Sequence, residues 1–264
     1  MDSGSREGAL PNREDLAIFD LAKQAASLRA ALTDKGYVHV DAGSFRKMIG
    51  AAHPDALESL AALWGDLEPD SFMADGGRYR RRRHAAFELR GAGAERKPDQ
   101  PHFQSSAYNP LNGDVERWFA PAREELVRHP VLQSLFALCT PLFSALENKG
   151  EADLDWDGEL HQFRIEALGV EAGLPTPEGM HRDGVDWVLV MLIDRSNVEA
   201  GMTEILDEAG RRDSFTLSDP GEVVLLDDRR IRHGVTAIHA LDPSRPAYRD
   251  VLVMTWRRRG GQPG

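Results

Sequence analysis

The sequence predicts an α+β protein in which a helical N-terminal half packs on a β-rich C-terminal core. Two observations predict this class. Up to about residue 150, apolar residues mostly recur at the three- and four-residue spacing of an amphipathic helix. Beyond that point, short runs rich in Val, Ile and Leu alternate with turn residues at roughly even spacing, which is typical of an antiparallel sandwich or barrel.

The helical half is expected to begin after a disordered N-terminus, residues 1–14. Helical spacing then runs over residues 16–32, and Gly36 is placed to end that helix. The next residues, "YVHV", predict a short strand, and "PDALESLAALWGDL" predicts a second helix. These elements would pack on one side of the β-core.

The middle of the chain mixes both patterns. The arginine-rich "YRRRRHAAFELR" is expected to be a strand or hairpin arm, and residues 115–146 are expected to form two or three helices separated at prolines. The β-core follows over about residues 158–258, and we expect residues 15–258 to form one domain. Its expected strands are "LHQFRIEALGV", "WVLVMLID", "MTEILDEAG", "RDSFTLSD", "EVVLLDD", "HGVTAIHAL" and "RDVLVMTWRRR".

The composition argues against several classes of protein. A net charge of -11 argues against a nucleic-acid binder, because phosphate binding needs clustered positive charge. The single cysteine, Cys139, allows neither an internal disulfide nor a thiolate zinc site. We find no secretory signal and no window near the roughly 18 apolar residues that a membrane span needs. We therefore expect a cytoplasmic protein, with a homodimer as one expectation for its oligomeric state.

A pair of metal-ligand residues stands before an apolar run. His181 and Asp183 are two residues apart, so in an extended segment both side chains point to the same side and can reach one ion. Gly184 then permits a tight turn. A His-x-Asp pair alone occurs by chance in many proteins, but His233, which also precedes a glycine, can add a third ligand. Two histidines and one carboxylate fit the facial triad of a non-haem Fe(II) site.

An arginine opens the last expected strand. Arg249 presents a planar fork of donors that matches a carboxylate. Its anionic partner is expected to be either a ligand or a nearby acid such as Asp250. Arg245 lies in the turn-rich "DPSRPAY" and is expected to be solvated.

With these residues, the sequence resembles the Fe(II)/2-oxoglutarate-dependent dioxygenases, and especially the bacterial subgroup of L-isoleucine 4-hydroxylase, which hydroxylates free amino acids. The resemblance covers about residues 77–257. It implies a double-stranded β-helix (jelly-roll) core, Fe(II) bound by His181, Asp183 and His233, and 2-oxoglutarate bound by Arg249. It also implies that O₂ is consumed, that 2-oxoglutarate is decarboxylated to succinate and CO₂, and that a C–H bond of a small substrate, expected to be an amino acid or a derivative, is hydroxylated.

Two pairs of strand residues are further candidates for the ligand pocket. Arg80 and Arg82 share one face of their expected strand, so either could bind the carboxylate of the substrate. They could equally belong to a charged face paired with local acids. Gln162 and Arg164 could line the 2-oxoglutarate or substrate pocket, or form the polar outer face of a half-buried strand.

Tyr108 and Asn109 lie in a turn-rich segment that could cover the site and contact the substrate. Six other histidines show no comparable partners and are expected to be structural or surface residues: His39, His53, His84, His102, His129 and His239.

Two alternatives remain open at this point. The same scaffold could catalyse desaturation or another oxidation in a natural-product pathway. A non-catalytic jelly-roll could instead bind a metal or an anionic ligand.

Overall fold

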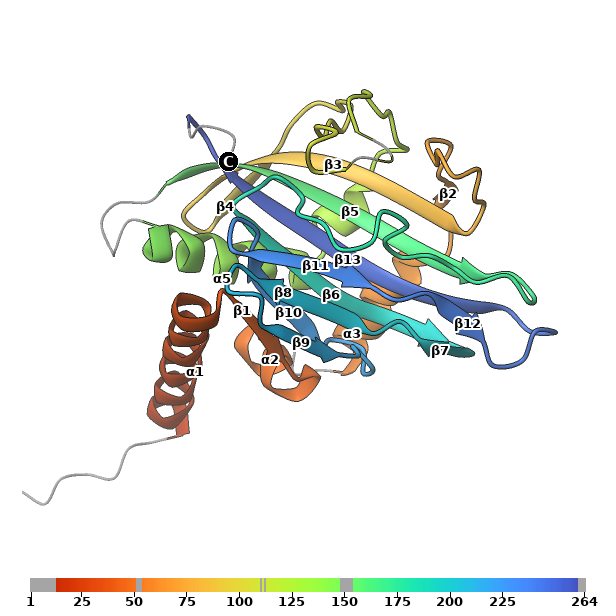
Figure 1. Ribbon diagram of the computed structural model, residues 1–264. Coiled ribbons are helices and arrows are strands. Elements are labelled where there is room, and N and C mark those ends of the chain that lie inside the picture. Colours follow the sequence, from red (N-terminus) through yellow and green to blue (C-terminus); the bar gives the residue numbers. More distant parts are fainter. Residues whose placement is uncertain (1–12, 51–53, 110, 112, 148–153, 261–264) are drawn as a thin grey trace, which may run out of the picture.

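A large antiparallel sheet forms the middle layer of the molecule (Figure 1). The computed structural model describes residues 13–50, 54–109, 111, 113–147 and 154–260. Its helices are α1 (Arg13–Lys35), α2 (Ala42–Met48), α3 (Pro54–Ala61), the 3-10 helix η1 (Ala62–Trp64), α4 (Glu124–Val127) and α5 (Pro130–Glu147). Its strands are β1 (Tyr37–Val40), β2 (Glu68–Pro69), β3 (Arg80–Arg90), β4 (Gly93–Arg96), β5 (Asp155–Ala167), β6 (Trp187–Ser196), β7 (Val198–Ala200), β8 (Thr203–Asp207), β9 (Arg212–Phe215), β10 (Val223–Asp227), β11 (Ile231–Val235), β12 (Ile238–Ala240) and β13 (Ala247–Arg258).

The strand order confirms the jelly-roll core. The large sheet runs β1-β10-β6-β13-β5-β3-β2, with β4 paired to β3, and every pairing between these strands is antiparallel. Two small sheets, β11-β8-β9 and β12-β7, face it (Figure 1). Helices pack on the opposite face, where one apolar cluster joins residues of α1, α2, α3 and α5 to residues of the large sheet. Each strand of the large sheet therefore has one face toward the helices and the other toward the small sheets.

Aromatic residues join the helical half to the sheet. Phe143 of α5 stacks on Trp187 of β6 at 4.8 Å and meets Trp256 of β13 edge-on at 4.9 Å. The indole Nε1 of Trp256 donates to Thr140 Oγ1 at 3.0 Å, so its one polar group is satisfied in the core. Helices and sheet thus share a core, which supports the expectation of one domain.

Helix α5 corrects two expectations from the sequence. It runs unbroken through Pro141, where a break was expected. It is also long and apolar enough to span a membrane by length and composition, with a mean hydropathy of 1.2 over 18 residues. Its apolar side chains, among them Leu135, Phe136 and Cys139, are nevertheless buried against the sheet. Helix α5 therefore has the properties of a core helix, because a buried core helix can be as long and as apolar as a membrane span.

Other local predictions are also corrected. Helix α2 was not expected; Asp41 caps it by accepting a hydrogen bond from the Ser44 amide at 2.9 Å. Residues 115–123 are not helical, because their backbone groups bond to other segments: Ala122 N donates to His84 O at 2.8 Å. The expected strand "HGVTAIHAL" is divided between β11 and β12, and His233 lies within β11 rather than at its start.

The expected disordered and frayed ends fall largely outside the described residues. Residues 1–12 and 261–264 are not described, whereas Arg13 and Glu14 already belong to α1. Gly36 ends that helix with a φ of +79°, as the sequence predicts.

Candidate metal centre and ligand cavity

His181, Asp183 and His233 meet beside a cavity of about 310 Å³, which lies between the large sheet and the small sheets. The backbones of His181 and His233 pair in an isolated antiparallel bridge, with both N···O distances at 3.0 Å. Asp183 Oδ1 is 3.5 Å from His181 Nε2, and Asp183 Oδ2 is 3.6 Å from His233 Nε2. One ligand atom of each residue lies within 4.8 Å of the others, so the three side chains can bind one metal ion.

The turn that carries these residues is held by a buried carboxylate. Asp228 accepts hydrogen bonds from the backbone amides of Asp183, Gly184 and Val185 at 2.9, 2.7 and 3.1 Å. Gly184 has a φ of +78°, and a Cβ there would lie 2.6 Å from the Tyr108 ring. Only glycine fits this turn without strain. Sequence analysis missed Asp228. Its signal in the sequence is that it is the second of two acids that directly follow the apolar run "VVLL".

Hydrogen bonding leaves the outer nitrogen of His181 free for a metal. His181 Nδ1 lies 2.9 Å from the carbonyl of Gly179, so Nδ1 carries a proton and donates it there. Nε2 then points toward Asp183, and toward Glu178, whose Oε1 is 3.6 Å away. A carbonyl at the far nitrogen is the usual support of a metal-binding histidine.

Each charged group at this centre shifts the pKa of its neighbours. Burial disfavours the charged form of His181, but the hydrogen bond to Asp183 and its negative charge raise the pKa of His181 to about 9. Burial also opposes ionisation of Asp183, yet the hydrogen bond to His181 and the charges of both histidines hold the pKa of Asp183 below its ordinary value. Burial and repulsion from His181 lower the pKa of His233 to about 4. Burial and the charge of Asp183 raise the pKa of Asp228 to about 7.

Arg249 lines the same cavity without an anionic partner. Its side chain is 1% exposed, and Nε and one terminal nitrogen have no hydrogen-bond partner among the described residues. Burial and repulsion from Arg195 lower the pKa of Arg249 to about 10. Asp250 bonds instead to Arg164, at 2.8 and 2.6 Å, so the expected alternative of an Arg249–Asp250 ion pair is wrong. A buried, unpaired guanidinium is costly unless a ligand satisfies it.

Gln162 and Arg164 do not reach the cavity. Gln162 Nε2 donates to the carbonyl of Leu63 at 3.0 Å, on the helix side of β5. Arg164 pairs with Asp250 and stacks on Tyr248 at 4.1 Å. Because successive strand residues face opposite sides, Phe163 and its alternate neighbours line the cavity instead. The expectation that Gln162 and Arg164 bind the cofactor is therefore wrong.

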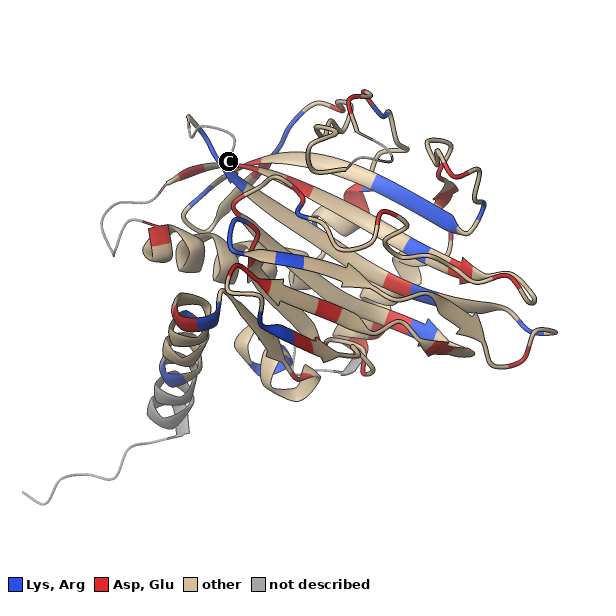
Figure 2. Ribbon diagram, in the orientation of Figure 1, with Lys and Arg blue, Asp and Glu red and all other residues tan. Residues whose placement is uncertain are grey.

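Arg80 and Arg82 both line the cavity, as their shared strand face predicts. Arg80 Nε donates to Asp70 at 2.7 Å, which leaves a terminal nitrogen of Arg80 unpartnered among the described residues. Arg82 lies between the rings of Phe119 and Phe163, at 3.6 and 4.5 Å. Figure 2 shows the run of arginines in β3 as a blue stretch of ribbon at one end of the strand. Both arginines are buried in the cavity wall.

Residues of the described segments 101–109 and 113–123 line one side of the cavity. Asn109 lines the cavity and donates to Gln104 Oε1 at 3.0 Å. Tyr108 lies against Gly184 and is not among the residues that line the cavity, and its contact with a substrate stays a prediction. Arg117, which sequence analysis missed, is 3% exposed, lines the cavity and has an unpartnered Nε among the described residues.

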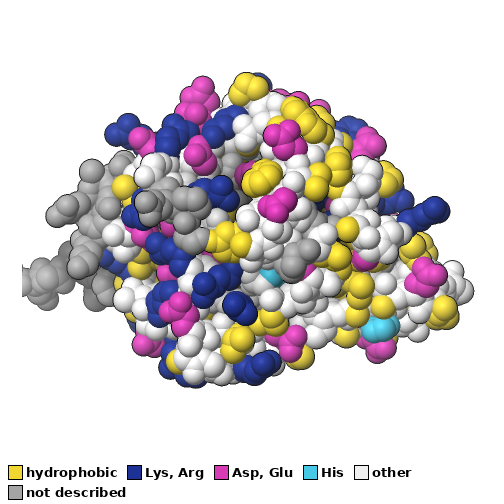
Figure 3. Space-filling view, turned by 45° about the horizontal axis from the view of Figure 1, so that its top comes forward, with side chains coloured by type: hydrophobic (Ala, Val, Ile, Leu, Met, Phe, Trp, Pro, Cys, Tyr) yellow, Lys and Arg dark blue, Asp and Glu magenta, His cyan; other side chains and the backbone are white. Residues whose placement is uncertain are grey.

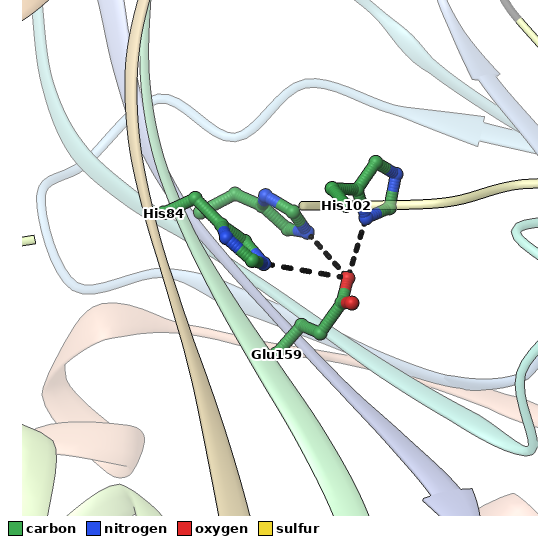
Figure 4. A group of neighbouring side chains, drawn as sticks. His84, His102 and Glu159 are labelled. Atoms are coloured by element: carbon green, nitrogen blue, oxygen red, sulfur yellow. Dashed lines mark hydrogen bonds and ion pairs between the residues drawn. The ribbon is translucent and has the colours of Figure 1, made fainter. Parts of the chain in front are cut away.

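A second cluster of histidines lies in the same cavity and corrects another expectation. His84 and His102 gather with His161 around the carboxylate of Glu159 (Figure 4). Both had been expected to lack such partners. Their positions are far apart in the sequence, so no local spacing could reveal them. In the space-filling view, a histidine side chain shows between Lys and Arg side chains on one side and hydrophobic side chains on the other (Figure 3).

Two curated oxygenases are similar to this chain in sequence. A curated 3(1)-hydroxy-L-isoleucine 4-dioxygenase from Pantoea ananatis (strain AJ13355) is 29% identical over 159 residues, which are 60% of this chain and 64% of that protein. An L-isoleucine-4-hydroxylase from Bacillus thuringiensis is 26% identical over 157 residues, which are 59% and 64% of the two chains. The matched stretch thus spans less than two thirds of each curated relative.

A solved structure and a family model cover more of the chain. The crystal structure of a bsmA homolog from Methylobium petroleophilum PM1 is similar over 91% of this chain and 96% of its own, with a TM-score of 0.81 and 37% sequence identity. The model of the 2OG-Fe dioxygenase family, whose members use Fe(II), 2-oxoglutarate and O₂, matches residues 61–255. This chain therefore belongs to the 2OG-Fe dioxygenase family.

Proposed function

We propose that the protein is an Fe(II)- and 2-oxoglutarate-dependent dioxygenase that hydroxylates an unactivated C–H bond of a free amino acid or an amino acid derivative. The observation that carries the proposal is the meeting of two kinds of group in one cavity. His181, Asp183 and His233 offer a facial set of ligands, and Arg249 offers an unpaired guanidinium.

The donor set fits iron. Two imidazole nitrogens and one carboxylate are the ligands of the non-haem Fe(II) triad. The proton on His181 Nδ1 is held by Gly179, and Asp228 fixes the turn around Asp183. When bound, Fe(II) with 2-oxoglutarate and O₂ supplies the oxidising power for C–H hydroxylation.

Arg249 fits the distal carboxylate of 2-oxoglutarate. Its fork of donors can bind both oxygens of a carboxylate, and its burial strengthens that interaction. Val190, Val251 and Val253 give the cavity an apolar wall. The ligand would then satisfy the buried charge that the described residues leave unpaired.

The substrate is inferred from the remaining charges of the cavity and from the relatives. Arg80, Arg82 and Arg117 each have a buried nitrogen without a partner among the described residues, so the cavity can bind a second carboxylate. The curated relatives are named for isoleucine and hydroxyisoleucine, which are amino acids. A cytoplasmic location, a homodimer and a single domain over residues 15–258 stay predictions.

Turnover of an amino acid panel tests the proposal. The purified protein is mixed without oxygen with Fe(II), 2-oxoglutarate and each L-amino acid; O₂ is admitted, and succinate and product masses are measured. We expect succinate that depends on the amino acid, with a product heavier by one oxygen, and neither with Asp183→Ala. A product lighter by two hydrogens would favour desaturation. No succinate with any compound would favour a binding protein.

A further inference from the structure

Glu159 presents a partly satisfied carboxylate to the cavity (Figure 4). Its Oε2 lies 2.6 Å from His102 Nδ1, 3.3 Å from His161 Nε2 and 3.7 Å from His84 Nε2. All three imidazoles are directed at this one oxygen. Oε1 has no hydrogen bond to the described residues, and the side chain is 25% exposed to the cavity. One carboxylate oxygen is therefore held in place, and the other is available to a ligand.

The protons of the cluster argue against a metal ion. A terminal nitrogen of Arg82 lies 2.7 Å from His161 Nδ1; because arginine only donates, Nδ1 must be the acceptor. A neutral His161 then carries its proton on Nε2 and donates it to Glu159. The same proton blocks Nε2 as a metal ligand.

The cluster has the charge and acceptors that an ammonium group needs. Burial opposes ionisation of Glu159, but the charges and hydrogen bonds of its histidines hold its pKa well below the ordinary value. Burial lowers the pKa of His102 and His161, so the rings are neutral near pH 7. His102 lines the cavity and donates from Nδ1 to Glu159 Oε2 at 2.6 Å, so the Nε2 of its neutral ring is left as an acceptor. An ionised carboxylate with a neighbouring imidazole nitrogen matches a group that can only donate.

A guanidinium stands next to this carboxylate. The backbones of His102 and Arg117 pair in an antiparallel bridge with N···O distances of 3.0 Å, and directly paired residues project to the same side. Both side chains line the cavity, and His102 bonds to Glu159. A positive and a negative group are thus held side by side, as an amino acid zwitterion requires.

We propose that Glu159, together with His102, binds the primary ammonium group of the substrate. The inference rests on the proposed function and narrows it to substrates with a free amine. Arg117, beside Glu159, would bind the carboxylate of the same molecule. An amine that is acylated would lose its charge and clash with the histidine cluster.

Selectivity of the wild-type protein is the first test, because it does not depend on the folding of a variant. Succinate formation is measured with L-isoleucine, N-acetyl-L-isoleucine and 3-methylpentanoate, which has the same carbon chain without the amine, and with matching sets for other L-amino acids. We expect a KM at least about tenfold lower for a free amino acid than for its two analogues. Equal KM values would overturn the ammonium subsite and leave the proposed function standing. Activity only with the N-acetylated compounds would also overturn the subsite and leave the proposed function standing, whereas a protein inactive with every compound would contradict both.

A matched pair of variants is the second test. Glu159→Gln keeps the shape of the side chain and removes its charge, and Asp157→Asn does the same two residues away on the same strand face, where Asp157 pairs with Lys97. We expect Glu159→Gln to raise the KM for the amino acid at least about tenfold and to abolish the preference over the amine-free analogue. Iron content and the KM for 2-oxoglutarate should not change, and Asp157→Asn should behave as wild type. An unchanged preference in a folded Glu159→Gln protein would overturn the inference.

Metal content separates an ammonium subsite from a second metal site. After incubation with Fe(II) or Zn²⁺ and removal of the excess, we expect one ion per wild-type chain and none in Asp183→Ala. An ion that persists in Asp183→Ala and is lost in Glu159→Gln would show that the cluster binds metal and would overturn the inference.

Discussion

Two clusters of histidine and carboxylate share one cavity, and they differ in what holds the far nitrogen of a histidine. In the first cluster, His181 Nδ1 donates to a backbone carbonyl, so Nε2 is directed at Asp183 and can bind a metal. In the second, His161 Nδ1 accepts from Arg82, so Nε2 keeps a proton for Glu159. Similar residue types therefore serve different chemistry, because one hydrogen bond fixes where the imidazole proton lies.

Removal of one histidine from each cluster tests most directly whether only the first cluster binds metal. We expect His181→Ala to lower iron affinity by more than about a hundredfold and to reduce succinate formation to background, because the loss of a ligand exceeds the loss of a supporting group. His84→Ala should retain iron. Iron content after desalting and 2-oxoglutarate decarboxylation measure both effects. Equal loss of iron in the two variants would contradict the distinction between the clusters.

Arg249 and Arg82, the arginines beside the two clusters, differ in the same way: one lacks partners and the other has them. Arg249 lacks a partner for two of its nitrogens among the described residues, whereas Arg82 bonds to His161 and lies between two aromatic rings. We expect Arg249→Met to raise the KM for 2-oxoglutarate by about a hundredfold, since two charge-assisted hydrogen bonds are lost. The melting temperature without ligand should not fall, because an unpaired buried charge is removed.

Arg82→Met is the control for this prediction, because it removes a buried arginine that has partners. It should lower the melting temperature without ligand. If Arg249→Met were instead the more destabilising of the two, Arg249 would have a structural partner, and its assignment to 2-oxoglutarate would fail.

The sequence predicted the first cluster because its information is local. His181 and Asp183 are two residues apart, the β-runs around them have turn signals, and Arg249 lies near the start of a strand. The same alternation placed Arg80 and Arg82 on one face correctly. It could not say which face of β5 meets the cavity, so Gln162 and Arg164 were assigned to the wrong side.

The second cluster and the supporting residues depend on contacts that are distant in sequence. His84, His102 and Glu159 come from β3, a loop and β5, and only the register of β3 on β5 brings His84 opposite His161. Residues 115–123 have helical spacing but form backbone bonds with β3 and with His102, so tertiary contacts override the local pattern. Asp228 is recognisable only once the turn it holds is known.

The first cluster also has a backbone support, because the carboxylate of Asp228 holds the turn that carries Asp183. We expect Asp228→Ala to lower iron affinity about 10- to 100-fold, as loss of a supporting group does, with the fold retained. Iron titration and thermal denaturation together measure this. An unchanged iron affinity would mean that the Gly184 turn holds Asp183 without Asp228.

The smallest expected effect concerns protons. Without metal, the hydrogen bond to Asp183 outweighs burial and raises the pKa of His181 to about 9, so His181 is charged at pH 7. His233, with a pKa lowered to about 4 by burial and by His181, is neutral there, and Asp183 is ionised. Because metal binding needs neutral histidines, binding at pH 7 should release about one proton, and iron affinity should rise about tenfold per pH unit up to about pH 9.

Calorimetric titration of the metal-free protein with Fe(II), in buffers of different ionisation enthalpy, counts this proton. The same shift stabilises the metal-free fold below the ordinary histidine pKa of 6.5, and that contribution is lost as the pH rises through about 9. Release of no proton at pH 7 would mean that His181 is neutral before metal binds. The first cluster would then resemble the second in its protonation, and the Gly179 and Asp183 contacts of His181 would not account for the difference between the two.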